Sequence, residues 1–121
     1  MSALIRKAVS SVMLAAGLAA GAVLAAPAAQ ASTSDCPSGY FCMWPEYNNN
    51  GAIKKYSYHV SDLGTFRNRD RSSYNHMSQA AMELYSQTGY VGFIACSRPG
   101  AVWTVHNPAM DTESLYKVPS C

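Results

Sequence analysis

The chain has 121 residues, of which 49% are hydrophobic and 13% charged, and its formal net charge is +2. A chain of this length fits one small domain, which excludes a large enzyme with a separate cofactor domain. It shows no repeat of solenoid length and no long helical periodicity.

The first 31 residues have the pattern of a secretory signal peptide. Arg6 and Lys7 precede a stretch rich in Ala, Val, Leu and Gly over residues 8–26, and Ala29-Gln30-Ala31 forms a small-x-small cleavage site. We therefore expect cleavage before Ser32, a secreted extracellular product over residues 32–121, and no membrane association after cleavage.

A retained membrane anchor is the alternative for this segment, because an apolar run of about 19 residues could just span a bilayer. Ser10 and Ser11 interrupt the run, which favours the signal peptide. Cleavage also removes Arg6 and Lys7, two of the nine basic residues, so that seven basic residues then balance seven acidic ones. A neutral product is unlike a nucleic-acid binder, and we expect no nucleic-acid partner.

All four cysteines, Cys36, Cys42, Cys96 and Cys121, lie in the expected mature chain. An even number in a small secreted chain predicts two disulfides, for which three pairings are possible. The turn Pro37-Ser38-Gly39 favours Cys36 with Cys42, which leaves Cys96 to pair with Cys121. No Cys-x2-Cys pair is present, so we expect no zinc site.

Short aromatic and β-branched runs, separated by turn residues, predict an all-β sandwich. Residues 78–85 are ambiguous between strand and helix, because Ala, Met, Glu and Leu are good helix formers. Turns are expected at residues 48–51, 88–89 and 98–100, where Asn, Gly and Pro suit tight turns. The expected strands are residues 40–44, 52–58, 80–85, 90–96, 101–106 and 114–118.

The sequence Cys36-Pro37-Ser38-Gly39-Tyr40-Phe41-Cys42-Met43-Trp44 resembles the opening of a secreted bacterial peptidase-inhibitor family, typified by the Streptomyces metalloproteinase inhibitor. The resemblance continues through most of the mature chain and implies a Greek-key βγ-crystallin-like sandwich. Crystallin motifs carry an aromatic, four residues, a second aromatic, one residue and a glycine, and residues 85–92 fit this pattern completely. In the equivalent first repeat, residues 44–51, Asn49 replaces the second aromatic, so we expect an irregular hairpin there.

Residues Asn68-Arg69-Asp70-Arg71-Ser72-Ser73 resemble the crystallin calcium signature. Calcium takes six to eight oxygen ligands, whereas Arg69 puts a guanidinium, which only donates, at the second ligand position. We therefore expect no cofactor, with calcium binding weak or absent, and Ser72 and Ser73 holding the loop against the sheet. The arginines of this segment and Arg67 suit a solvated loop better than a phosphate site.

Enzyme motifs are missing from the sequence, and we expect a protein that is not an enzyme. His59, His76 and His106 are isolated along the chain and fit strand or loop positions. A hydrolase is the alternative if two carboxylates meet in a cleft. The six candidates are Glu46, Asp62, Asp70, Glu83, Asp111 and Glu113.

The resemblance implies a secreted proteinase inhibitor that binds an extracellular peptidase through a rigid loop. The best candidate loop is Cys96-Ser97-Arg98-Pro99-Gly100-Ala101, because a disulfide and Pro99 would preorganise it for binding. The family implies a metalloproteinase target, whereas Arg98 suits the acidic pocket of a trypsin-like enzyme, so the class of target stays open. We expect the inhibitor to be a monomer.

The alternative is a non-inhibitory secreted module: a cell-wall or carbohydrate binder, or a small toxin like the crystallin-type killer proteins. Its support is aromatic, because exposed rings can stack on a sugar. The candidate rings are Trp44, Tyr47, Tyr56, Tyr58 and Trp103.

Overall fold

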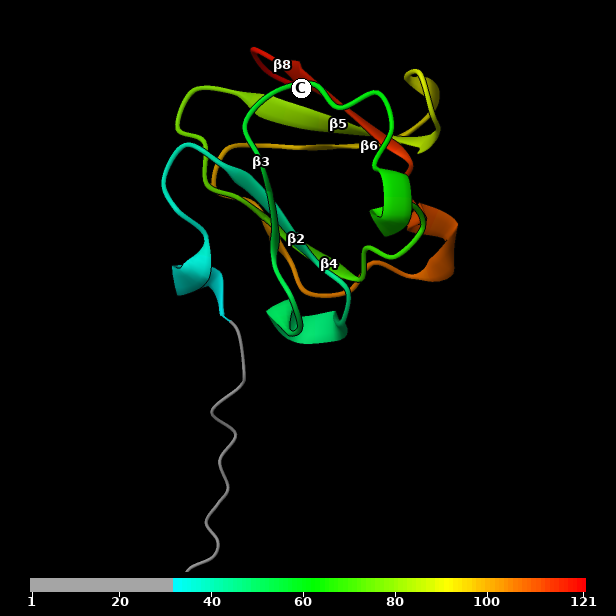
Figure 1. Cartoon of the computed structure of the whole chain (residues 1–121). Coiled ribbons are helices and arrows are strands. Elements are labelled where there is room, and N and C mark those ends of the chain that lie inside the picture. The colour runs from blue at the N-terminus through cyan, green and yellow to red at the C-terminus, as the bar shows by residue number, and fades with distance from the viewer. Residues whose placement is uncertain (1–31) are drawn as a thin grey trace, which may run out of the picture. The chain divides into compact units, whose positions relative to one another are not determined.

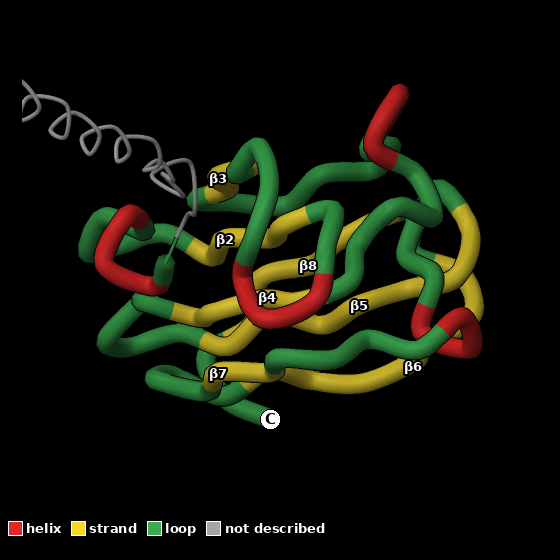
Figure 2. The backbone as a smooth tube through the Cα atoms, turned by 90° about the horizontal axis from the view of Figure 1, so that it is seen from below, coloured by secondary structure: helices red, strands yellow, loops and turns green. Residues whose placement is uncertain are grey.

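The computed structural model describes residues 32–121, which form two antiparallel sheets (Figure 1). The first sheet has the order β3-β2-β4-β7 and the second the order β6-β5-β8. In Figure 2 the first order can be followed from top to bottom and the second from bottom to top. The strands are β2 (Phe41–Trp44), β3 (Lys54–Tyr56), β4 (Ser72–Asn75), β5 (Ala81–Gln87), β6 (Val91–Ser97), β7 (Val102–Trp103) and β8 (Ser114–Val118).

Short 3-10 turns lie before β2 and in the connections between the strands. They are η2 (Thr33–Asp35), η3 (Tyr47–Asn49), η4 (Gly64–Phe66) and η5 (Pro108–Met110). The predicted signal peptide and the alternative anchor fall outside the described residues. Within residues 32–121, no helix is long and apolar enough to cross a membrane.

Residues 32–78, the first half, contain β2, β3 and β4, and residues 79–121, the second half, contain β5 to β8. Each half contributes one extended segment to the sheet of the other half. β7 leaves the second half and pairs with β4, opposing Trp103 to Ser73. In return, Val60 of the first half exchanges two backbone hydrogen bonds of 2.9 Å with Leu115 of β8. Non-sequential pairing of this kind is the hallmark of a Greek key.

The main core lies between the two sheets. Phe41 and Met43 of β2 and Met82 and Leu84 of β5 are completely buried and belong to one apolar cluster with Leu115. The alternate residues of β2, Cys42 and Trp44, form a second cluster with Cys36. β2 is therefore buried on both faces, as its uninterrupted apolar sequence requires.

β4 is a strand that the sequence pattern does not predict. Its sequence, Ser72 to Asn75, is polar and has low strand propensity except at Tyr74. The structure nevertheless buries Ser72, Ser73 and Asn75 completely, because each side chain finds a hydrogen-bond partner. The ambiguous segment 78–85 is resolved in favour of a strand, since Met82 and Leu84 both face the core.

The first hairpin, residues 44–51, is fastened by a serine of β4. Ser72 Oγ donates to the carbonyl of Glu46 (2.7 Å) and accepts from the backbone N–H of Asn49 (2.8 Å). Asn49 has a φ of 60°, and Gly51 folds so closely over Pro45 that a Cβ there would lie 2.7 Å from Pro45 Cγ. The loop-holding role predicted for Ser72 is confirmed.

The second hairpin, residues 85–92, is fastened in the same way from β8. Ser114 Oγ donates to the carbonyl of Gln87 (2.6 Å) and accepts from the N–H of Tyr90 (3.1 Å). Tyr90 has a φ of 66°, and a Cβ on Gly92 would collide with Ser86 Oγ. The first hairpin, which was expected to be irregular, is thus held by the same pair of serine hydrogen bonds as the second hairpin. It differs from the second hairpin by its η3 turn.

Both disulfides have the predicted pairing, Cys36 with Cys42 and Cys96 with Cys121. The first closes the segment that leads into β2. The second joins the end of β6 to the last residue of the chain. The described part of the chain holds no free cysteine.

Candidate functional site

The predicted inhibitory loop connects β6 with β7, at the end of the second sheet. Arg98, Pro99 and Gly100 are exposed, whereas Ser97 is completely buried. The N–H of Ala101 donates to the carbonyl of Arg98 (3.0 Å), which closes a four-residue turn. Gly100 has a φ of 83°, the positive value that a type II turn with proline at its second position requires. We call residues 98–101 the Arg98 turn.

The Arg98 turn is anchored by Asn75, a completely buried residue at the end of β4. The side-chain amide of Asn75 donates to the carbonyl of Ser97 (2.8 Å). Its backbone carbonyl accepts from the N–H of Gly100 (2.7 Å), and its N–H donates to the carbonyl of Ala101 (2.9 Å). One residue therefore holds both ends of the turn.

The same amide also donates to the carbonyl of Ala80 (3.1 Å), and its oxygen accepts from the N–H of Met77 (3.0 Å). Asn75 thus fixes the chain before β5 together with the turn. No sequence motif identifies this residue. Its one signal was an asparagine in a β-protein outside any expected turn, where asparagine is disfavoured unless its side chain is bonded.

The disulfide Cys96–Cys121 is a second constraint at the base of the Arg98 turn. Arg98 itself takes part in no ion pair within residues 32–121. The turn therefore presents an exposed and unpaired cation on a backbone with little conformational freedom, which lowers the entropy cost of binding a partner.

His106 lies in a buried polar network that joins the two halves of the chain. Its Nδ1 lies 2.8 Å from Asp70 Oδ2 and its Nε2 lies 2.9 Å from Ser73 Oγ. Thr112 donates to the same carboxylate through its N–H (2.9 Å) and its hydroxyl (2.7 Å). The order Ser73–His106–Asp70 is that of a hydrolytic triad, but all three side chains are completely buried, so no substrate reaches them.

The family model described as "Peptidase inhibitor family I36" matches residues 29–97. The chain belongs to peptidase inhibitor family I36. As a member of this family, the protein is a proteinase inhibitor whose partner is a peptidase, and it is not an enzyme. The match includes Cys96 and Ser97 and ends there, so Arg98, Pro99 and Gly100 lie beyond it.

The fold agrees with that of a solved structure described as "Evolution of the eye lens beta-gamma-crystallin domain fold". The TM-score is 0.59 at 16% sequence identity, with 69% of this chain and 90% of that chain covered. The predicted βγ-crystallin fold of the inhibitor is therefore confirmed. No curated protein matches the chain.

The carboxylates of the hydrolase alternative do not meet in a cleft. Five of the six bind separate partners: Asp62 pairs with Arg67, Asp70 with His106, Glu83 with Tyr85, Asp111 with Arg71 and Glu113 with Asn68. The inhibitor uses these groups for internal contacts. Of the three arginines Arg67, Arg69 and Arg71, the first and the last are thereby paired with carboxylates.

The segment that resembles the calcium signature is also occupied by internal contacts. Asp70 accepts bonds from His106 and Thr112, Asn68 Nδ2 donates to Glu113 Oε2 (2.9 Å), and Ser72 ties the first hairpin. Arg69 is exposed. Weak or absent calcium binding stays a prediction.

The aromatic residues named for a stacking face do not assemble into one. Trp44 is completely buried, Tyr56 and Trp103 pack against the main core, and only Tyr47 and Tyr58 are exposed. Burial, with the charge of Asp70 as a smaller cause, raises the pKa of Tyr56 to about 12.

A different chain of rings crosses the outer side of the second sheet. Its members are Tyr58, His59, Tyr116, Tyr90, Tyr85 and Phe93, each in contact with the next. Most of these pairs meet edge to face, so the rings do not form a coplanar platform. The Tyr85 hydroxyl donates to Glu83 Oε1 (2.6 Å), which is the main cause that raises the pKa of Tyr85 to about 12.

Proposed function

We propose that this protein is secreted and inhibits an extracellular peptidase by placing the Arg98 turn in the enzyme's substrate cleft. The observation that carries the proposal is the anchoring of the turn by Asn75 at both ends, beneath an exposed Arg98. A peptide held rigidly in one conformation binds without the ordering cost of a flexible substrate. It also moves less readily along the path to cleavage.

Arg98 favours a trypsin-like serine proteinase as the target. Its guanidinium is a permanent cation with five N–H donors, which matches an acidic specificity pocket. A thermolysin-like enzyme prefers a bulky apolar residue after the scissile bond, and the exposed part of the turn offers none. Pro99 follows Arg98 directly and resists cleavage of the bond between them.

Inhibition constants decide between these targets. The mature protein, Arg98→Ala and Lys54→Ala are assayed against one trypsin-like and one thermolysin-like enzyme. Lys54 is an exposed cation on β3 in the first sheet, which makes it a matched control. We expect Arg98→Ala alone to weaken inhibition of the trypsin-like enzyme, by about 100-fold if Arg98 fills the pocket.

Equal inhibition by wild type and Arg98→Ala would remove the turn from the mechanism. Inhibition of neither enzyme would instead support the non-inhibitory module. Secretion has a separate test, since material purified from a culture supernatant should have an intact mass that begins at Ser32. A mass that includes Met1 to Ala31 would contradict cleavage.

A further inference from the structure

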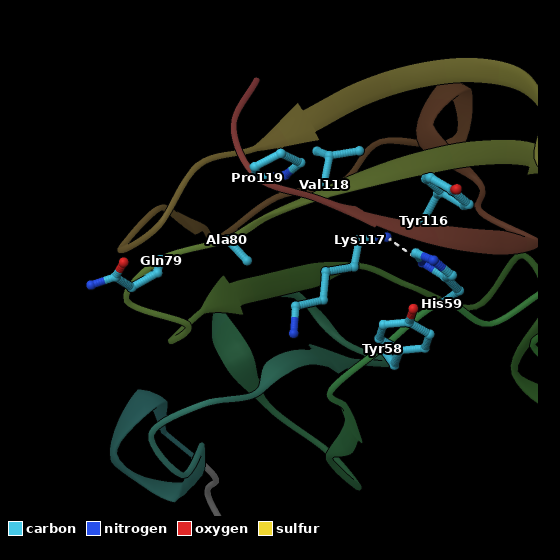
Figure 3. Close-up of a pocket in the computed structure, with 8 residues that line it drawn as sticks. All are labelled: Tyr58, His59, Gln79, Ala80, Tyr116, Lys117, Val118 and Pro119. Atoms are coloured by element: carbon cyan, nitrogen blue, oxygen red, sulfur yellow. Dashed lines mark hydrogen bonds between the residues drawn. The ribbon is translucent and has the colours of Figure 1, made fainter.

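Figure 3 shows the residues that line a pocket of about 420 Å³. The pocket lies at the same end of the second sheet as the Arg98 turn. Antiparallel pairing sets this arrangement, because Met82 of β5 opposes Ser97 on one side and Lys117 on the other. Two strand spacings, roughly 10 Å, therefore separate Ser97 from Lys117. The residues that line the pocket are Tyr58, His59, Gln79, Ala80, Tyr116, Lys117, Val118 and Pro119.

The aromatic wall of the pocket is held rigidly against β8. The backbone N–H of Lys117 donates to His59 Nδ1 (2.9 Å), the contact drawn as a dashed line in Figure 3. Because a backbone N–H can only donate, the neutral His59 ring carries its proton on Nε2. The ring stacks on Tyr116 with centroids 3.9 Å apart and touches Tyr58 at 4.0 Å.

Lys117 is the one charged side chain among the eight lining residues, and no acidic residue lines the pocket. Its half-buried side chain reaches the carbonyl of Ser57 (3.3 Å), and its Nζ lies 5.7 Å from the centroid of the Tyr58 ring. It takes part in no ion pair with the residues that the structure describes. The ammonium lies at an exposed position and has no counterion among these residues, so an incoming carboxylate can form a charge-assisted hydrogen bond with it.

The pocket continues into a neighbouring hollow, which shares Gln79, Ala80 and Lys117 and extends to Gly39. We call the combined surface the Lys117 groove. Its position relative to the Arg98 turn is fixed by Asn75, whose amide donates both to the carbonyl of Ala80 and to that of Ser97. The groove and the turn are therefore held in a fixed arrangement by one buried residue.

We propose that the Lys117 groove is a second contact site for the inhibited peptidase. Lys117 binds a carboxylate side chain from an acidic segment beside the enzyme's substrate cleft, and Tyr58 packs against the apolar neighbours of that carboxylate. Charge complementarity supports this partner, because residues 76–81, 96–101 and 117–121 include Arg98 and Lys117 but no acidic side chain. The inference rests on the proposed function, the inhibition of an extracellular peptidase.

The test compares Lys117→Glu, Lys117→Met and Lys54→Glu with wild type against a peptidase that the wild type inhibits. We expect Lys117→Glu to raise the inhibition constant at least about tenfold, because it sets like charges against each other. Lys117→Met keeps the apolar stem and should give a smaller rise, whereas Lys54→Glu should stay within about twofold. The loss should shrink at high salt, where surface charges are screened.

The outcomes separate this inference from the role of the turn. If Arg98→Ala weakens inhibition while both Lys117 variants match wild type, the second contact is overturned and the turn stands. If the Lys117 variants weaken inhibition and Arg98→Ala does not, the groove stands without the turn. A wild type that inhibits no peptidase overturns both. Thermal unfolding of Lys117→Met shows whether a loss of inhibition reflects the charge or the fold.

Discussion

At the scale of single residues, the conformation of the candidate site is held by one buried asparagine. Asn75 binds the residue before the Arg98 turn, two residues within it and the segment that precedes β5. Its side-chain amide uses both hydrogens on backbone carbonyls, those of Ser97 and Ala80. The conformation of the turn therefore depends on a residue more than 20 positions earlier in the chain.

Asn75→Ala should lower the free energy of unfolding by about 2–4 kcal/mol, because it removes the buried side-chain hydrogen bonds to the carbonyls of Ser97 and Ala80 and to the N–H of Met77. It should also speed hydrogen exchange at the N–H of Gly100. Urea unfolding and amide exchange measure the two effects. Asn107→Ala is the control, since that exposed asparagine accepts one bond from Ala109 at the start of η5, and its loss should cost about 1 kcal/mol. Equal losses in the two variants would contradict the anchoring role.

The pair formed by Tyr85 and Glu83 predicts a pH dependence in the alkaline range. The folded pKa of Tyr85, about 12, lies above its ordinary value of 10.0, so the fold favours the neutral phenol. This stabilisation is complete below pH 10 and is lost as the pH rises through about 12. Glu83→Gln should bring the pKa of Tyr85 back toward 10, as measured by ultraviolet titration of tyrosinate. The high pKa of Tyr56 should remain, since burial is its main cause.

At the scale of elements, the sequence predicted the strands whose residues alternate with clear turn signals. β2, β5, β6 and β8 lie within about two residues of their expected positions, and Gly89 and Gly100 take the positive φ expected of their turns. β3 and β7 are shorter than expected. β4 was not predicted, because it is stabilised by hydrogen bonds to residues distant in sequence and not by a pattern of apolar residues. One example is the hydrogen bond between Ser73 and His106.

The same reasoning explains which parts of the site were predictable. The Arg98 turn is contiguous, and its Pro-Gly pair carries a local signal. The Cys36–Cys42 pairing was also local, because a turn separates the two cysteines, and it determined the other pair. Asn75 and Lys117 became recognisable only when the register of β5 placed Ser97 and Lys117 on either side of Met82.

The serine ties of the two hairpins should be equivalent in energy. Ser72→Ala and Ser114→Ala each leave one N–H and one carbonyl without their serine partner, so each should lower the free energy of unfolding by about 1–3 kcal/mol. Ser57→Ala, at an exposed position, should change it by less than about 0.5 kcal/mol. Denaturant unfolding of the three variants checks this. A neutral result at Ser72 alone would show that η3 holds the first hairpin without its serine.

At the scale of the whole molecule, the two disulfides contribute unequally. They span sequence separations of 6 and 25 residues. Loop-closure entropy then gives about 2 kcal/mol for Cys36–Cys42 and about 3.5 kcal/mol for Cys96–Cys121. Replacing each pair with serines should reproduce this order in thermal unfolding. The Cys96–Cys121 variant should in addition weaken inhibition, because that bridge fastens the base of the Arg98 turn.

β7 pairs with the first sheet and Val60 pairs with the second sheet. This mutual pairing has a consequence for a chain that is cut between β4 and β5. Each disulfide closes within one half, so no covalent link would join fragments 32–78 and 79–121. Fragment 32–78 would lack β7, the partner of β4, and fragment 79–121 would lose the backbone pairing of Leu115 with Val60. We expect each fragment alone to lack the β-sheet circular dichroism of the intact protein and an equimolar mixture to regain it. The chain would then be a two-piece complementation system, in which inhibition itself reports on reassembly.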